Sequence, residues 1–565
     1  MGGEPVPVQR GGCRKVTRAG GPGRPRAASG VRPPSPTEPP TTFDEVGRCK
    51  ERRDGAGCQR GDRQDACLWH GPGVRHGGSV ERHDLRRQGT AVTTDVNSQA
   101  GETAQPELRR VLGPKLLLLF VIGDILGTGV YALTGDVAGE VGGAAWAPFL
   151  VAFAVATLTA FSYLELVTKY PQAAGAALYA HKAFGLHFLT FLVAFAVMSS
   201  GITSASTASK FFAENLVVAF SLDLGTTAVM TIALAFMAVL ALINLRGVSE
   251  SVKFNVVLTL VELTGLLLVI LIGFYAMSQG GADFSRVMVF ETSADRSTFV
   301  AITAATSLAF FAMVGFEDSV NMAEETHDPT RTFPKVMLTG LGIAAFIYVL
   351  VSIAAVALVP VGTLADSETP LLEVVRTGAP GLPMDQIYPV ISMFAVANTA
   401  LINMLMASRL IYGMAKQDVL PRSLASVLPA RRTPWASIVF VTLVAFGLIF
   451  VVTQVMGEDT VEALGGTTAL LLLGVFTLVN VSCLVLRRAH HVDHDHFKAP
   501  TVVPVLGAIT CAFLVGPWTD RDTVQYQIGG GLLLLGVVLW LLTWLWNRGA
   551  RGKKTGFRHV DDLDG

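Results

Sequence analysis

The sequence predicts an all-α integral membrane protein with about twelve membrane-spanning helices. Apolar runs of roughly 20 residues, the length that crosses a bilayer as a helix, recur with few charges from about Pro114 to Trp546. Basic residues gather in alternate connections between these runs, and glycine interrupts two of the runs near their middle. The total hydrophobic content of 51% does not by itself distinguish a membrane protein from a soluble one, because soluble domains average roughly 45–50% apolar residues.

The apolar runs place the expected spans in order along the chain. The eleventh is the weakest of them, because it is short and contains Pro504. The expected spans are 115–138, 144–168, 186–212, 226–244, 252–277, 299–322, 336–358, 384–414, 435–456, 463–486, 502–515 and 529–546.

The charges between the spans support the same count. Basic residues precede the first span, follow each even-numbered span and continue after the last, beginning with Arg109, Arg110 and Lys115 and ending with Lys553, Lys554 and Arg558. The opposite connections carry acidic or mixed charge, as at Asp223, Asp283, Glu458 and Asp520. Because basic loops stay on the cytoplasmic side, we expect a multi-pass protein of the plasma (cell inner) membrane with both termini in the cytoplasm.

The chain divides into three parts by composition. Residues 1–105 are rich in Arg, Gly and Pro and have too few large apolar residues to bury a core, so a disordered extension is expected. A second interpretation is a mis-assigned start, with translation beginning at a valine such as Val92 or Val96. Residues 106–548 form the predicted twelve-helix domain, and residues 549–565 form a cytoplasmic tail.

Several other activities find no support in the sequence. Cys58, Cys67 and His70 do not have paired metal-ligand spacing, and the histidines within 490–496 suit a solvated loop better than a metal site. The chain has no phosphate-binding loop ending in Lys-Ser or Lys-Thr, so ATP drive is not expected. We therefore expect no enzyme activity, no cofactor, no metal and no nucleic-acid partner.

The first glycine interruption reads Gly127-Thr128-Gly129 and follows Asp124. Glycine favours unwinding, so the following half-helix would begin near mid-membrane with free N–H groups. A helix N-terminus carries about half a positive charge and suits a carboxylate, to which Thr128 would add a hydroxyl. The alternative is a notch of small residues that lets helices approach closely.

The second interruption runs from Ala312 to Gly315, after Phe311. Unwound carbonyls there, including that of Val314, would accept hydrogen bonds from an ammonium group, and Phe311 would cover a bound ligand. The alternative for Phe311 is packing against lipid or core. Paired interruptions in the two halves of a membrane protein indicate a transporter's binding site, and a carboxylate site facing an ammonium site fits an amino acid.

Ionisable residues inside spans are functional candidates, because they are expensive in a membrane. Asp124 adjoins the first interruption, Glu262 lies in the middle of span five, and Glu317 follows the second interruption. We expect these three as candidates for proton coupling. Glu165 is expected to be structural more often than functional, and Asp318 to be structural or to line the site.

Four stretches resemble the amino acid–polyamine–organocation permeases from about Lys115 to Trp546. Residues 125–131 read Ile-Leu-Gly-Thr-Gly-Val-Tyr, residues 163–166 read Tyr-Leu-Glu-Leu, residues 310–317 read Phe-Phe-Ala-Met-Val-Gly-Phe-Glu, and residues 407–414 read Ala-Ser-Arg-Leu-Ile-Tyr-Gly-Met. The third continues to an Asp-Pro-x-Arg-x-x-Pro loop at 328–334 and is the most specific.

The resemblance implies a five-plus-five inverted repeat with spans one and six broken, plus two extra helices. It implies secondary transport of an amino acid by alternating access, usually driven by protons or by exchange. Carried over by residue, Gly127, Thr128 and Gly129 would hold the carboxylate, Ala312, Val314 and nearby carbonyls the amine, and Phe311 would act as a gate.

Two departures keep alternatives open. Glu262 stands where many proton-coupled relatives resemble one another in having a lysine, and Asp124 stands where many have a small or apolar residue. An acid beside the site would favour a cationic amino acid or a polyamine, or would carry the coupling proton. The remaining alternatives are an amino acid exchanger and, in another class, a membrane nutrient sensor that does not transport. The oligomeric state stays open.

Overall fold

The computed structural model describes residues 112–172, 175–246, 251–291, 297–323, 325–429, 431, 433–489, 495–551 and 555–556. The predicted extension at 1–105, the histidines 490, 491 and 494 and most of the tail at 549–565 lie outside these residues.

The described chain is helical, with isolated β-bridges but no strand among the described residues. Eleven segments are long and apolar enough to cross a membrane. They are α1 with α2 (Pro114–Ile125 and Thr128–Val141), α3 (Trp146–Lys169), α5 (His187–Ala219), α6 (Thr226–Arg246), α7 (Ser251–Ser278), α9 (Thr298–Ala309) with η1 (Phe310–Met313) and η2 (Asp318–Met322), α10 (Pro329–Leu358), α13 (Met384–Lys416), α14 (Trp435–Met456), α15 (Thr460–Ala489) and α17 (Thr523–Trp546).

The predicted eleventh span forms a helix that is too short to count with the others. It is α16 (Val502–Val515), and its 14 residues reach about 21 Å, against a hydrocarbon core of about 30 Å. Short connecting helices complete the chain: α4 (Gly175–Phe184), α8 (Phe284–Val287), η3 (Arg422–Ala425), α11 (Val361–Ala365), α12 (Pro370–Gly378), η4 (Gly457–Asp459), η5 (Pro517–Thr519) and η6 (Asn547–Arg551). The all-α membrane fold predicted from the sequence is confirmed.

Helix packing repeats between the first five spans and the next five. Span one (α1) packs on span seven (α10), and in the same way span six (α9) packs on span two (α3). Span three (α5) packs on span ten (α15), and span eight (α13) packs on span five (α7). Likewise α5 packs on α6 as α13 packs on α14. This exchange of partners is what two inverted five-helix repeats produce, with α16 and α17 left outside the repeat.

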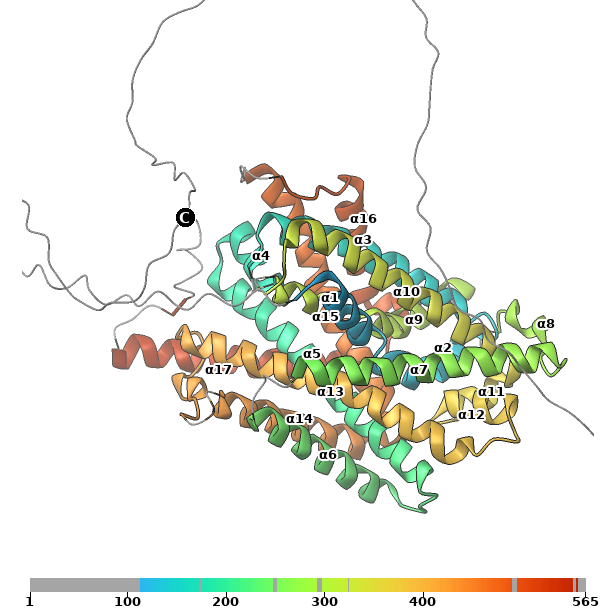
Figure 1. The fold of residues 1–565 in the computed structure, drawn as a ribbon. Coiled ribbons are helices and arrows are strands. Elements are labelled where there is room, and N and C mark those ends of the chain that lie inside the picture. The colour runs from blue at the N-terminus through green and yellow to red at the C-terminus, as the bar shows by residue number, and fades with distance from the viewer. Residues whose placement is uncertain are drawn as a thin grey trace, which may run out of the picture. The chain divides into compact units, whose positions relative to one another are not determined.

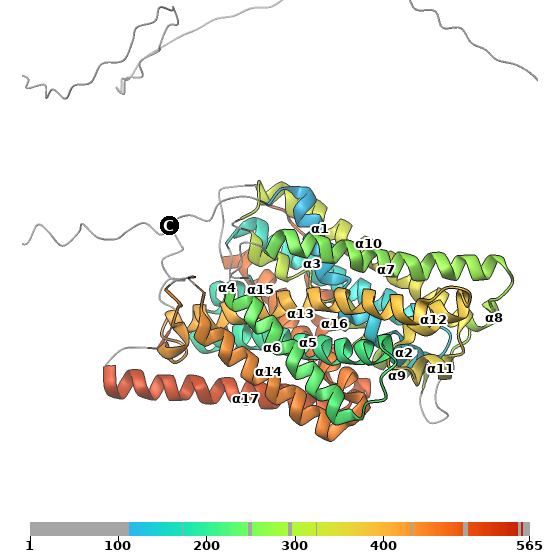
Figure 2. The ribbon, with the colours of Figure 1, turned by 60° about the horizontal axis from the view of Figure 1, so that its bottom comes forward.

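The two interrupted spans lie at the centre of the helical domain. In spans one and six, 78% of the most apolar stretch is buried, which is the highest share among the spans, whereas the share in α17 is only 22%. Figure 1 shows α5 and α13 passing side by side through the middle of the domain, and Figure 2 shows α17 along its edge. The interruptions are therefore surrounded by protein, the condition under which non-helical backbone is tolerated at membrane depth.

Candidate functional site

The first interruption lies where the sequence predicts it. Helix α1 ends at Ile125, Leu126 and Gly127 are non-helical, and α2 begins at Thr128. A Cβ on Gly127 would lie 2.4 Å from the Thr399 hydroxyl oxygen. The glycine therefore permits close packing against α13 as well as unwinding, and the first N–H groups of α2 lack partners within the helix.

The second interruption includes the predicted stretch, because α9 ends at Ala309 and η2 begins at Asp318. The backbone of η1 stays in a 3₁₀ turn through Met313, Val314 is extended, and Gly315 has a φ of 122°. Residues 314–317 belong to no helix, and the 3₁₀ turn before them pairs the carbonyl of Phe311 with the N–H of Val314 at 3.4 Å. The Gly315 N–H donates to Glu317 Oε2 at 2.9 Å, so Glu317 stabilises the turn.

The two interruptions meet around a small cavity of about 20 Å³. This volume holds about one water molecule, so the structure represents a closed site. Seven of the predicted site residues line it, together with residues from α5 and α13. The lining comprises Asp124, Ile125, Gly127, Thr128, Gly129, Phe311, Val314, Gly315, Asp318, Ser204, Thr399 and Asn403.

Three buried polar atoms in this lining have no hydrogen-bond partner among the described residues. They are Asp124 Oδ2, Thr128 Oγ1 and Thr399 Oγ1. Their residues are 4%, 1% and 5% exposed, respectively. A buried polar group without a partner costs roughly 1–3 kcal/mol, so three of them around one cavity indicate a place that receives a polar ligand.

Sequence reasoning did not identify which residues of spans three and eight line the cavity. Asn403 Nδ2 donates to Ser204 Oγ at 3.3 Å and to the Thr399 carbonyl at 3.0 Å, which ties α13 to α5 at the cavity wall. The available signal was the presence of small polar residues within apolar spans. Many such residues occur along α5, so the sequence alone could not select these three.

Three predicted site residues, Ala312, Glu262 and Glu317, do not line the cavity, and Glu317 holds the turn described above. Ala312 packs behind the cavity, against Gly129. Glu262 is fully buried on α7, with neither carboxyl oxygen hydrogen-bonded among the described residues. Its backbone carbonyl accepts a hydrogen bond from Tyr131 Oη at 2.7 Å, which joins α7 to the second half of the first broken span.

The buried carboxylate Glu165 has a structural partner. Arg487 Nε donates to Glu165 Oε1 at 2.6 Å, and the Ala499 N–H donates to Glu165 Oε2 at 2.8 Å. Glu165 therefore clamps α3 to the end of α15 and to the segment before α16. Among the described residues, no cluster of three His, Cys, Asp or Glu side chains has the arrangement of a metal site.

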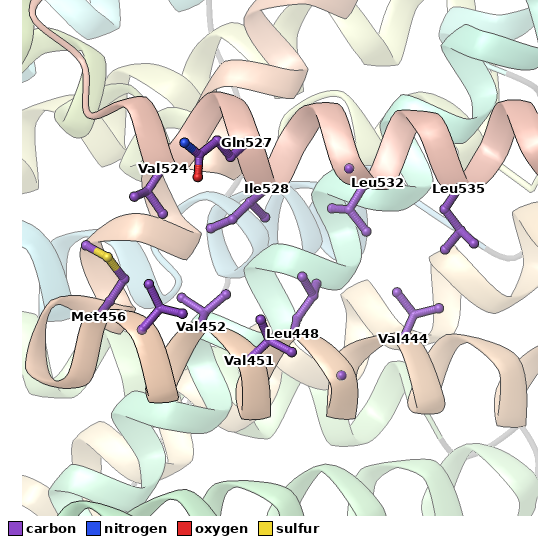
Figure 3. Close-up of a pocket in the computed structure, with 13 residues that line it drawn as sticks. Val444, Leu448, Val451, Val452, Met456, Val524, Gln527, Ile528, Leu532 and Leu535 are labelled. Carbon is purple, nitrogen blue, oxygen red and sulfur yellow. The ribbon is translucent and has the colours of Figure 1, made fainter.

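A larger cavity of about 460 Å³ lies elsewhere and is apolar. Figure 3 shows it as a groove between α14 and α17, where aliphatic side chains such as Val452, Ile528 and Leu532 face one another and Gln527 is the polar side chain among those labelled. It lacks the convergent polar groups of a substrate site, so the small central cavity remains the candidate.

The family model described as "Amino acid permease" matches residues 112–541 of this chain. Similar curated proteins include the methylthioribose transporter of Bacillus subtilis, 25% identical over 74% of this chain and 91% of the relative. The branched-chain amino acid permease BcaP of the same organism is 24% identical over 78% of this chain and 95% of the relative.

The chloroplastic cationic amino acid transporter 9 of Arabidopsis thaliana is 29% identical over 60% of each protein. Among solved structures, a manganese transporter mutant of Eremococcus coleocola covers 77% of this chain and 95% of its own. It is 14% identical with a TM-score of 0.48.

Proposed function

Because the chain belongs to the amino acid permease family, we propose that it is a secondary active transporter that moves an amino acid across the plasma membrane by alternating access. The observation that carries this proposal is the set of unpartnered polar atoms of Asp124, Thr128 and Thr399 around the central cavity. The same family membership favours a transporter over an enzyme.

The polar groups of the cavity match the two charged ends of an amino acid. The N–H groups at Gly127, Thr128 and Gly129 begin α2, where the helix dipole favours a carboxylate. The carbonyls around Val314 and the Asp124 carboxylate would receive the ammonium group. Phe311 lines the same cavity and would close over the ligand.

The size of the cavity supports alternating access. A space of about 20 Å³ excludes even a small amino acid, so the two interruptions must separate before a substrate enters. A substrate that binds one conformation more tightly than another would then shift the equilibrium between the state open to one side of the membrane and the state open to the other. The inverted repeats supply two halves that can rock against each other.

Proton coupling is part of the proposal, with Glu262, Asp124 and Glu317 as candidates. An ionised carboxylate without a partner is expensive in a membrane protein, whereas a protonated one is not. Glu262 is the strongest candidate, because neither of its carboxyl oxygens is hydrogen-bonded within the described part of the chain and it does not line the cavity. Glu317 is weaker, because the Gly315 N–H already occupies one of its oxygens.

The orientation of the chain follows from its basic loops, with both termini proposed in the cytoplasm, residues 106–548 as the transport domain and residues 1–105 as an extension. A nutrient sensor without transport activity is the competing function. The sensor would use the arginine-rich extension as a partner-binding arm, so its removal would abolish signalling while leaving a transporter active.

The test is uptake by the full-length protein reconstituted in proteoliposomes. A labelled panel of amino acids and polyamines is presented with and without an inward proton gradient. Gradient-driven accumulation of an amino acid is expected, and Gly127→Leu, which would press against Thr399, should abolish it without preventing membrane insertion. Flux only against preloaded amino acid would indicate an exchanger, and no flux by folded protein would favour the sensor.

A further inference from the structure

The central cavity has a neighbour that shares one wall with it. A second cavity of about 20 Å³ lies one turn further toward Lys416 along α13 and toward His187 along α5. Val314, Asp318 and Asn403 line both cavities. A ligand held at the two interruptions would therefore enter the second cavity wherever these three side chains move aside.

The second cavity holds no more than about one water molecule as it stands, but once the site opens it would receive the part of a substrate that extends beyond its backbone-like groups. Its lining combines aliphatic side chains with polar ones. The residues are Val197, Ser200, Gly201, Val314, Glu317, Asp318, Asn403, Met406, Ala407, Leu410, Thr468 and Leu472. An apolar wall that ends in polar groups suits a long side chain with a polar terminus.

The charges facing the two cavities all have one sign. Asp124 and Asp318 line the central cavity, and Glu317 and Asp318 line the second, whereas no Lys, Arg or His among the described residues lines either. Asp124 Oδ2 is buried without a partner, which independently indicates that a donor belongs in the first cavity. Ionised carboxylates gathered in a low-dielectric space repel one another unless one of them takes up a proton or a cation lies between them.

The three carboxyl groups differ in the partners that they have or are expected to bind. Glu317 accepts a hydrogen bond from the Gly315 N–H and so holds the turn. Asp124 lies beside the interruption, where the substrate's α-ammonium is expected. Among the described residues, no hydrogen bond or ion pair engages the carboxylate of Asp318. Asp318 is therefore free to meet a second positive group.

We propose that Asp318 binds the side chain of the substrate and gives the transporter a preference for amino acids whose side chain ends in a positive charge. This inference rests on the proposed function and assigns a substrate class to the same site. The Asp318 carboxylate, on the wall between the cavities, receives the terminal ammonium or guanidinium of a side chain that extends into the second cavity. An acidic side chain would be rejected there by like charge.

Lysine and norleucine provide a matched pair of substrates, because they differ in the terminal ammonium group. In proteoliposomes, the wild-type protein should transport lysine at least tenfold more efficiently than norleucine by kcat/KM. Asp318→Asn should remove most of this preference while retaining norleucine transport. Asp318→Glu, which keeps the charge, should retain a preference for lysine, and the exposed Asp366→Asn serves as the control.

The outcomes separate this inference from the proposed function. Norleucine transport without lysine transport, or an equal loss of both in Asp318→Asn, would overturn the role of Asp318 and leave amino acid transport standing. Failure of the folded wild type to transport any amino acid would instead refute the proposed function, and this inference with it. If Asp318→Asn does not fold, lysine-dependent inhibition of norleucine uptake by the wild type decides, and its absence would refute the cationic preference.

Discussion

Gly129 lies against the backbone of Ala312 so closely that a Cβ on Gly129 would come 2.4 Å from the Ala312 Cα. The two broken spans therefore touch main chain to main chain, directly beside the central cavity. A backbone atom cannot move aside as a flexible side chain can. Any side chain at position 129 would separate the two interruptions, and with them the groups proposed to hold the substrate.

Gly129→Ala should therefore abolish uptake while leaving membrane insertion intact. Overpacking of this kind costs roughly 1–3 kcal/mol, which should lower the thermal unfolding temperature of the purified protein. Gly342→Ala is the matched control, because Gly342 lies within α10 and no atom of the described residues comes within 4 Å of the added Cβ. Normal uptake by Gly129→Ala would show that the two spans need not approach this closely.

Gly315→Ala tests the conformation of the second interruption. Gly315 has a φ of 122°, and an added Cβ would lie 2.7 Å from the Asp124 carbonyl carbon. Backbone strain alone costs about 1–3 kcal/mol, and the contact adds to it, so both uptake and stability should fall. Gly457 has a φ of 60°, and an added Cβ would meet no atom of the described chain within 4 Å, so Gly457→Ala should lose some stability but retain uptake. Equal behaviour of the two variants would exclude a special role for the contact with Asp124.

The spans and both interruptions could be predicted because their signals are local. A long run of apolar residues favours a membrane-spanning helix, and a pair of glycines favours unwinding, whatever the rest of the chain does. Ser204, Thr399 and Asn403 could not be selected, because their role depends on which helices cross at the cavity. The packing of Gly129 on Ala312 could not be predicted for the same reason, since local sequence patterns do not show a contact between residues 183 positions apart.

Tyr348 supports the first interruption from α10. Its hydroxyl donates to the Ile125 carbonyl at 2.5 Å, at the point where α1 ends. Tyr348→Phe would leave that carbonyl without this partner, at a cost of roughly 1–3 kcal/mol, and should slow uptake by loosening the end of α1. Tyr179→Phe is the control, since the Tyr179 hydroxyl is buried and has no hydrogen-bond partner among the described residues. A larger effect of Tyr179→Phe on the unfolding temperature would contradict the role of Tyr348.

The pair of Glu165 and Arg487 should contribute to stability rather than to coupling. Their side chains are 2% and 13% exposed, and breaking a buried pair from one side costs about 3–5 kcal/mol. Glu165→Gln should therefore lower the unfolding temperature strongly, and adding Arg487→Gln should recover part of the loss. Glu373→Gln, in the more exposed pair with Arg376, should change stability by less than about 1 kcal/mol. An unchanged unfolding temperature with an altered pH profile would instead make Glu165 a coupling residue.

Glu262→Gln separates coupling from binding, because Glu262 is fully buried and lies outside the lining of the central cavity. The substitution keeps the shape of the side chain but removes its ability to take up and release a proton. Accumulation driven by a proton gradient should fall at least tenfold, whereas exchange of internal for external substrate should continue. Both modes are measured in the same proteoliposome preparation across a range of pH, with the exposed Glu368→Gln as a control. If Glu262→Gln retains the wild-type pH profile, the coupling proton is carried elsewhere, and Asp124 becomes the next residue to test.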